Sequence, residues 1–195
     1  DTAPVISSSP AFSAAENQTA VGTVVASDAS AVSFSISGAD LVISSTGVIS
    51  FVSAPDFEVK PTYTATVIVT DGVNETRQNI TVAVTNVDDV APVFTSATTF
   101  SAAENQTFIG AVTATDVDSD SVTFTVSSAE LEISNSGVLS FVTAADFEAK
   151  STYTVTVTAS DGTNTTSQVV TVTVLDADDT APVISSSPAF SAAEN

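Results

Sequence analysis

Short stretches of this chain alternate apolar residues with threonine or serine, which is the period of a β-strand that buries one face. Polar or glycine-containing segments such as Asp71-Gly72 and Ser45-Thr46-Gly47 separate them and are typical of turns. The alternating stretches come in three matched pairs, 32–36 with 122–126, 63–67 with 153–157, and 80–84 with 170–174. Because no stretch has a helical period, the pattern predicts an all-β chain.

The matched pairs arise from an internal repeat, which sets the domain organisation. Pro4 corresponds to Pro92, Pro92 corresponds to Pro182, and residues 179–195 copy residues 1–17 letter for letter. We therefore expect a first repeat at 1–88, a second at 89–178 and the N-terminal stub of a third at 179–195. About seven short strands in roughly 90 residues predict two tandem Greek-key seven-stranded β-sandwich domains, with the stub as the first strand of a third.

The composition supports packed cores and is strongly acidic. Of the 195 residues, 43% are hydrophobic. Three residues are basic and 23 are acidic, which gives a net charge of −20. Such a charge repels nucleic acid and anionic membrane surfaces, so neither is an expected partner. We also expect no membrane insertion by this segment, because no apolar run approaches the length of a membrane-spanning helix, and we interpret it as part of a longer secreted chain.

The side-chain inventory points to hard cations and away from catalysis. Histidine and cysteine are absent, which removes zinc sites and the usual nucleophilic triads, so we expect no catalytic residue and no enzyme. The carboxylates gather at predicted loops and strand ends, where Asp-x-Asp and Asp-x-Glu place two of them two residues apart. Calcium takes six to eight such oxygens in a tolerant geometry. The alternative is an acidic surface that water alone solvates.

The motifs in order are Glu16-Asn17, Asp56-x-Glu58, Asp116-x-Asp118, Ala159-x-Asp161-Gly162, and acidic linkers that end in Ala-Pro. This order resembles a cadherin repeat, and more narrowly the cadherin-like tandem repeats of large bacterial surface adhesins. The resemblance implies Ca²⁺ ions at the junction between successive repeats. It implies one metal site made of Glu16, Asp56, Glu58, Asn86, Asp88, Asp89, Asp116, Asp118 and Asp161. It implies a second, half site made of Glu104, Asp146, Glu148, Asp176, Asp178 and Asp179.

The two repeats differ in one loop that carries part of this pattern. The first repeat has Asp28-Ala29-Ser30-Ala31 where the second has Asp116-Val117-Asp118-Ser119-Asp120-Ser121. A third repeat that follows the first would lack the second aspartate. We therefore hypothesise that calcium-rich, stiff junctions alternate with poorer and more flexible ones. Equal Ca²⁺ stoichiometry at both types of junction would contradict this hypothesis.

The leading functional expectation is an extracellular, cell-surface spacer of an adhesin or fibre, stiffened by Ca²⁺ between neighbouring repeats, with a cell-surface ligand bound elsewhere in the full protein. A rival reading is a carbohydrate- or protein-binding module in which calcium is purely structural. A third is a filament subunit that joins identical chains head to tail by strand addition through residues 179–195. Tyr63 and Tyr153 could stack on sugar, but each begins an alternating stretch, which favours a place in the core.

Overall fold

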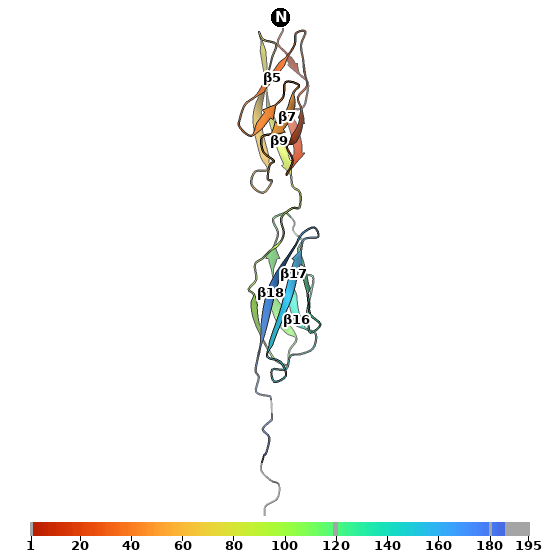
Figure 1. Ribbon diagram of the computed structural model, residues 1–195, viewed down its shortest axis with the longest axis vertical. Helices are drawn as coiled ribbons and strands as arrows, with labels where there is room; N and C mark the ends of the chain where they lie inside the picture. Colours follow the sequence, from red (N-terminus) through yellow and green to blue (C-terminus); the bar gives the residue numbers. More distant parts are fainter. Residues whose placement is uncertain (1, 119–120, 180, 186–195) are drawn as a thin grey trace, which may run out of the picture. The chain divides into compact units, whose positions relative to one another are not determined.

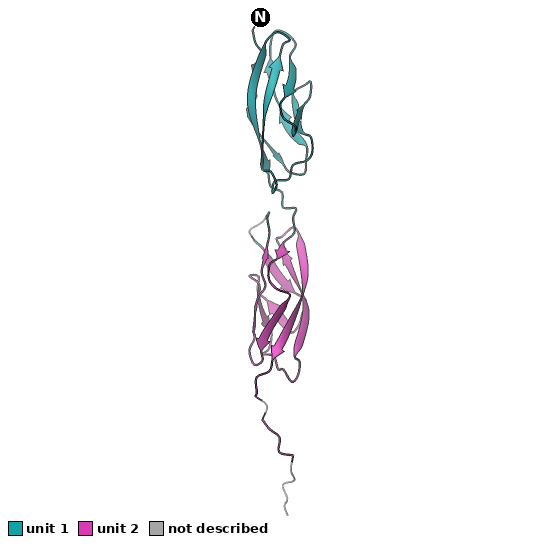
Figure 2. Cartoon of the chain, turned by 90° about the vertical axis from the view of Figure 1, so that its left-hand side faces the viewer, with its two compact units in different colours: residues 1–91, 116–121 teal, residues 92–115, 122–195 magenta. Residues whose placement is uncertain are grey.

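A computed structural model describes residues 2–118, 121–179 and 181–185. It divides the chain into two compact units (Figure 2). Unit 1 comprises residues 1–91 together with 116–121, and unit 2 comprises residues 92–115 and 122–195. Most of the expected third-repeat stub, namely residues 180 and 186–195, lies outside the described residues.

Unit 1 is built from two main sheets and one short strand pair. The four-stranded sheet has the order β2 (Ala11–Ala15), β9 (Glu75–Thr85), β8 (Thr62–Thr70), β5 (Ser33–Ile36). The three-stranded sheet has the order β3 (Ala20–Thr23), β7 (Val48–Phe51), β6 (Leu41–Ile43), and β1 (Val5–Ile6) pairs with β4 (Ala26–Ser27). Strand β2 runs parallel to β9, whereas the other pairs are antiparallel.

Unit 2 repeats this arrangement strand for strand, and Figure 1 labels its strands β16, β17 and β18. Its four-stranded sheet has the order β11 (Thr99–Ala103), β18 (Thr165–Leu175), β17 (Thr152–Ser160), β14 (Thr123–Val126). Its three-stranded sheet has the order β12 (Phe108–Ala111), β16 (Val138–Phe141), β15 (Leu131–Ile133), and β10 (Val93–Phe94) pairs with β13 (Ala114–Thr115). The seven strands of the main sheets confirm the predicted all-β sandwich, and the short pair was not anticipated.

The period of two in the sequence explains how each sandwich closes. In unit 1, Val67 and Val69 of β8 and Val82 of β9 are fully buried, and they share one core with Ile49 and Phe51 of the other sheet. The alternate residues of β8 and β9 face outward and are mostly polar, such as Thr64 opposite Thr81 and Thr66 opposite Asn79. Burying one face of each sheet against the other is the main source of stability in such a fold.

The tight turn before β7 requires glycine. Gly47 has a φ of +84°, a left-handed conformation that other residues rarely adopt, and a Cβ there would lie 2.3 Å from the carbonyl oxygen of Val24. Gly137 repeats both features in unit 2, with a φ of +88° and a distance of 2.1 Å to the carbonyl oxygen of Val112. The turn predicted at Ser45-Thr46-Gly47 is therefore confirmed.

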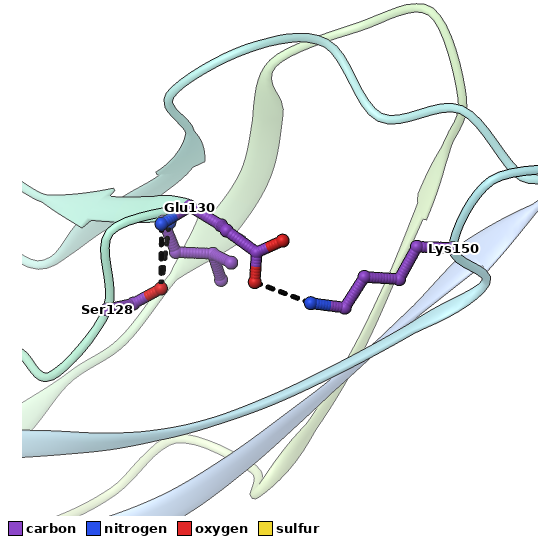
Figure 3. A network of polar contacts seen from close by, with 4 residues as sticks. Ser128, Glu130 and Lys150 are labelled. Carbon is purple, nitrogen blue, oxygen red and sulfur yellow. Dashed lines mark hydrogen bonds and ion pairs between the residues drawn. The ribbon is translucent and has the colours of Figure 1, made fainter.

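The only two lysines of the chain make equivalent surface contacts. Lys150 forms an ion pair with Glu130, whose backbone N–H donates to Ser128 Oγ at 3.0 Å (Figure 3). Its Nζ also lies 4.2 Å from the ring centroid of Tyr153, and that ring packs against the core. Lys60 does the same with Asp40 and Tyr63. Both tyrosines are thus core residues that a lysine covers, as the alternation favoured.

Among the residues that the structure describes, no helix could span a membrane.

Candidate metal centre

The buried carboxylate of Glu16 connects two loops at the end of β2. Glu16 is only 4% exposed. Its Oε2 accepts the N–H of Phe57 at 2.8 Å, and its Oε1 accepts the N–H of Val87 at 2.7 Å. A buried carboxylate with two backbone donors is a strong, charge-assisted anchor. Glu16 therefore fixes both the loop at 56–60 and the start of the linker after β9.

The loop at 56–60 is a single turn that presents two carboxylates. Asp56 Oδ1 accepts the N–H of Val59 at 2.9 Å, and its carbonyl oxygen accepts the N–H of Lys60 at 2.9 Å. The Phe57 side chain packs against the core, which anchors the middle of the motif. This places carboxylate oxygens of Asp56 and Glu58 within 4.8 Å of each other and of Glu16.

The loop at 116–121 belongs to unit 1 by its contacts, although it lies between β13 and β14 in the sequence. Asp118 Oδ2 accepts the backbone N–H groups of Asp89 at 3.0 Å and Val90 at 2.7 Å. Its own N–H donates to Asp116 Oδ1 at 2.9 Å, and its carbonyl oxygen accepts Asn86 Nδ2 at 3.4 Å. The Asp118 carboxylate therefore holds the linker by accepting two of the linker's backbone N–H groups.

These loops bring carboxylates together in three overlapping groups. In each group, one oxygen of every member lies within 4.8 Å of the others. Glu58 belongs to two groups and Asp118 to two, so the groups form one continuous cluster. The groups are Glu16 with Asp56 and Glu58, Glu58 with Asp89 and Asp118, and Asp88 with Asp116 and Asp118. We call these seven residues the unit 1 cluster.

The electrostatics of the cluster are those of crowded like charges. Loss of water around the carboxylate, together with a proton shared with Asp118, raises the pKa of Glu58 to about 7. Conversely, the N–H of Val90 holds the pKa of Asp118 below its usual range. A neutral Glu58 beside an ionised Asp118 is the familiar outcome when two carboxyl groups share one site.

The cluster fits a hard divalent cation. Among the described residues, Oδ1 of Asp118 is a buried oxygen that no hydrogen-bond donor reaches. Such an acceptor is satisfied either by a proton on a neighbouring carboxyl group or by a cation. All side chains of the cluster are carboxylates, whose oxygens are the ligands that Ca²⁺ prefers. Histidine and cysteine, which supply the nitrogen and sulfur ligands favoured by zinc, are absent from the sequence.

Two residues expected in this site lie outside the cluster. The side-chain amide of Asn86 donates to the backbone carbonyl oxygen of Asp118, and Asn86 contributes no carboxylate. Asp161 belongs to unit 2, where its Oδ1 accepts the N–H groups of Thr163 at 2.7 Å and Asn164 at 2.6 Å. Within the described part of the chain, its Oδ2 is buried without a hydrogen-bond partner.

Unit 2 holds a smaller group that repeats the same construction. Glu104 is 5% exposed, and its carboxylate accepts the N–H of Phe147 at 2.9 Å and of Ala177 at 2.7 Å. Its group comprises Glu104, Glu148 and Asp179. A backbone hydrogen bond at Glu148 acts to lower the pKa of this residue. Loss of water around the carboxylate and repulsion by Glu104, Asp176 and Asp179 outweigh it and raise the pKa of Glu148.

The remaining members of the expected half site do not join this group. Asp146 accepts the N–H of Ala149 at 2.9 Å in the same turn that Asp56 forms in unit 1. Asp176 acts on Glu148 through its charge, and Asp178 is exposed. The structure therefore brings three of the six expected residues together, compared with seven of nine in unit 1.

Sequence reasoning did not assign a role to the asparagines that follow the buried glutamates. Asn17 Nδ2 donates to Asp89 Oδ2, and Asn105 Nδ2 donates to Asp179 Oδ2 at 2.6 Å. The signal was present, because Glu-Asn recurs at the same place in both repeats. It was missed because an amide is a weaker candidate ligand than the carboxylates around it.

A shallow groove of about 430 Å³ lies on the outer face of β8 and β9 in unit 1. Thr64, Thr66 and Asn79 are among its lining residues, and Thr66 Oγ1 donates to Asn79 Oδ1 at 2.8 Å. Its hydroxyl and amide groups are thus partly satisfied by one another, and the aromatic residues that usually stack on sugar do not line it.

Comparisons with known proteins agree with the sandwich architecture. Residues 88–174 match the family model described as bacterial Ig domain. A search of curated protein sequences found no match.

The solved structures that resemble the chain include cadherin ectodomains. Mouse cadherin-23 EC22-24 has a TM-score of 0.79 and 21% identity, over 92% of this chain and 68% of that one. Human protocadherin-24 EC1-2 has a TM-score of 0.75 and 21% identity, over 90% of this chain and 99% of that one. Protocadherin gammaB7 EC3-6 has a TM-score of 0.74 and 26% identity, over 92% of this chain and 52% of that one. This chain spans half or less of human desmocollin-1 and Drosophila N-cadherin EC1-4. The two units therefore have the fold of tandem cadherin-like repeats.

Proposed function

We propose that this segment is a calcium-stiffened spacer of an extracellular surface protein. Ca²⁺ bound by the unit 1 cluster would tie the linker at 86–91 to the loop at 116–121, and so couple two successive repeats. The observation that carries the proposal is the pair of hydrogen bonds from Asp89 and Val90 to Asp118, which hold the linker at 86–91 against the loop at 116–121. The cadherin-like fold supports a tandem structural module.

The proposed stiffening follows from the charge of the cluster. The carboxylates of the cluster lie within 4.8 Å of one another inside each group and repel, and this repulsion opposes a fixed arrangement of the linker and the loop. Ca²⁺ takes six to eight oxygen ligands and would reverse the sign of these interactions. Glu16, Asp56, Glu58, Asp88, Asp89, Asp116 and Asp118 would hold the ions, and Asn86 and Asp161 would complete the set.

The same proposal extends to location and partners. A segment of this kind would lie outside the cell, on a bacterial surface, and its immediate partners would be the neighbouring repeats of its own chain. A ligand on another cell would be bound elsewhere in the full protein. Residues 104, 148 and 179 would form part of a second calcium site that the following repeat completes.

Calorimetric titration of Ca²⁺ into the chelator-treated chain tests the proposal. We expect binding of roughly two or three ions at the unit 1 cluster, since its oxygens can complete about that many coordination shells. A variant with Glu58→Gln and Asp118→Asn should lose most of the heat, whereas the matched control Glu132→Gln, which removes an exposed charge on β15, should keep it. Absence of binding by the unmodified chain would overturn the proposal and leave the cluster as a solvated acidic surface.

A further inference from the structure

Asn17 and Asn105 share a backbone conformation that sets them apart. They have φ angles of 61° and 62°, and among the described residues they are the only non-glycine residues with positive φ. Asparagine tolerates this left-handed region better than most residues, although glycine adopts it more readily. Selection of asparagine over glycine at both positions points to a use for the side chain.

The backbone of each asparagine is fixed on the neighbouring loop. The N–H of Asn17 donates to the carbonyl oxygen of Pro55 at 3.0 Å, and the N–H of Asn105 donates to that of Ala145 at 2.9 Å. The preceding glutamates are buried and anchored by two backbone donors each. The asparagine side chain is therefore carried by a rigid support.

Both side chains reach the same position of the linker. Asn17 Nδ2 donates to Oδ2 of Asp89, and Asn105 Nδ2 donates to Oδ2 of Asp179. In each linker this is the second of two consecutive aspartates. All four residues are exposed, so core packing does not impose the contact. The contact between asparagine and aspartate occurs in both units and is therefore a recurring feature of the repeat.

We propose that Asn17 and Asn105 are positioning residues that hold this linker aspartate in the orientation required to bind a divalent cation. The inference rests on the proposed calcium function and deepens it. The amide donates to one carboxylate oxygen, Oδ2, and thereby fixes the orientation of the whole carboxylate group. The side chain thereby loses rotational freedom before the ion arrives, which is the usual benefit of preorganisation.

A neutral amide suits this task better than a charged donor. Lysine or arginine at position 17 would pair with the clustered carboxylates and compete with the cation. The three basic residues of the chain instead form ion pairs at Asp40, Glu130 and Glu75. An amide N–H can orient a carboxylate without neutralising it.

A double-mutant cycle on the calcium affinity tests the proposal. Asn17→Gly keeps the left-handed backbone accessible and removes only the amide. It should weaken Ca²⁺ binding by about two- to tenfold, the factor that corresponds to ordering one side chain. Asp89→Ala should weaken binding further, and the double variant should match Asp89→Ala alone. Additive losses in the double variant would show that Asn17 does not act through Asp89 and would overturn the inference.

Two further measurements separate positioning from a merely structural role. Glu132→Gln, which removes an exposed charge on β15 outside every carboxylate group, is the control and should leave Ca²⁺ binding unchanged. In the metal-free protein, the side-chain amide resonances of Asn17 should shift on Asp89→Ala substitution, whereas those of Asn105 should not. If the unmodified chain binds no Ca²⁺, the proposed function itself fails; if it binds and the cycle is additive, only the present inference fails.

Discussion

Asp118 Oδ2 accepts the backbone N–H of Val90 at 2.7 Å, and this contact connects the loop at 116–121 with the linker at 86–91. The N–H of Asp89 donates to the same oxygen at 3.0 Å. The first repeat has no residue equivalent to Asp118, because its corresponding loop is two residues shorter, Asp28–Ala31 against Asp116–Ser121. The contact is therefore specific to one of the two loop types in the chain.

Replacing Asp118 should disrupt both the metal cluster and the hold on the linker. Asp118→Ala removes a ligand shared by two of the three carboxylate groups and leaves two backbone N–H groups without their acceptor. We expect calorimetry to show at least roughly tenfold weaker Ca²⁺ binding, since ligand charge tunes the affinity of such sites. Unchanged affinity would exclude Asp118 from the site. Glu132→Gln again serves as the charge-matched control.

Exchange of the two loops tests the hypothesis of alternating junctions. Substituting the sequence Asp-Ala-Ser-Ala for residues 116–121 converts the second repeat to the loop type of the first. We expect fewer bound Ca²⁺ ions and a more flexible junction, measured by calorimetry and by limited proteolysis of the linker. The reciprocal variant, with the six-residue loop placed at 28–31, should leave this junction unaltered. Equal stoichiometry in both loop types would contradict the hypothesis.

The sequence predicted the fold more completely than the geometry of the cluster. Alternation in β8 and β9 identified the inward residues Val67 and Val82, because a strand period of two depends only on local order. The short β1–β4 pair escaped prediction, since a contact of two residues leaves no periodic trace.

The carboxylate motifs indicated which loops to compare but could not show how they meet. Asp118 and Asp116 lie in one Asp-x-Asp motif, yet the Asp118 carboxylate accepts the N–H of Val90 in the linker, whereas the Asp116 carboxylate accepts the N–H of Asp118. Asp146 copies the turn of Asp56 but stays outside the unit 2 group. Such differences depend on how loops that are far apart in the sequence fold and meet in space. The role of Asn17 arises in the same way.

Glu16 should be more important for stability than its acidic neighbours. Glu16→Ala leaves the N–H groups of Phe57 and Val87 without an acceptor, at a cost of about 1–3 kcal/mol for each donor that remains buried. Urea denaturation in excess chelator should therefore show a free energy of unfolding lower by roughly 2–5 kcal/mol. Glu104→Ala should have the same effect on unit 2, while a loss below about 0.5 kcal/mol in either would refute the anchoring role.

Metal-free protein should become more stable as the pH falls below neutrality. The pKa of Glu58 is about 7 in the folded chain against an ordinary value of 4.5, so the folded state binds this proton more tightly than the unfolded state. The stabilising contribution is fully present below about pH 4.5 and is lost as the pH rises through about 7. The lowered pKa of Asp118 acts in the opposite direction, but only at pH values below its ordinary 3.8.

Thermal unfolding in chelator between pH 8 and pH 5 provides the measurement for this prediction. The melting temperature of unit 1 should rise as the pH falls, and Glu58→Gln should flatten the dependence. Saturating Ca²⁺ should reduce it as well, because the ion displaces the proton. A melting temperature that falls over this range, or that is insensitive to Glu58→Gln, would contradict the electrostatics of the cluster.

The central claim is that Ca²⁺ converts the junction from a flexible to a stiff connection, and solution scattering tests it most directly. Small-angle X-ray scattering of the chain in chelator and in saturating Ca²⁺ gives the maximum dimension and the breadth of conformations in each state. We expect Ca²⁺ to increase the maximum dimension and narrow the distribution, and chelator to reverse both changes. Binding of Ca²⁺ with identical scattering in the two states would contradict the spacer mechanism.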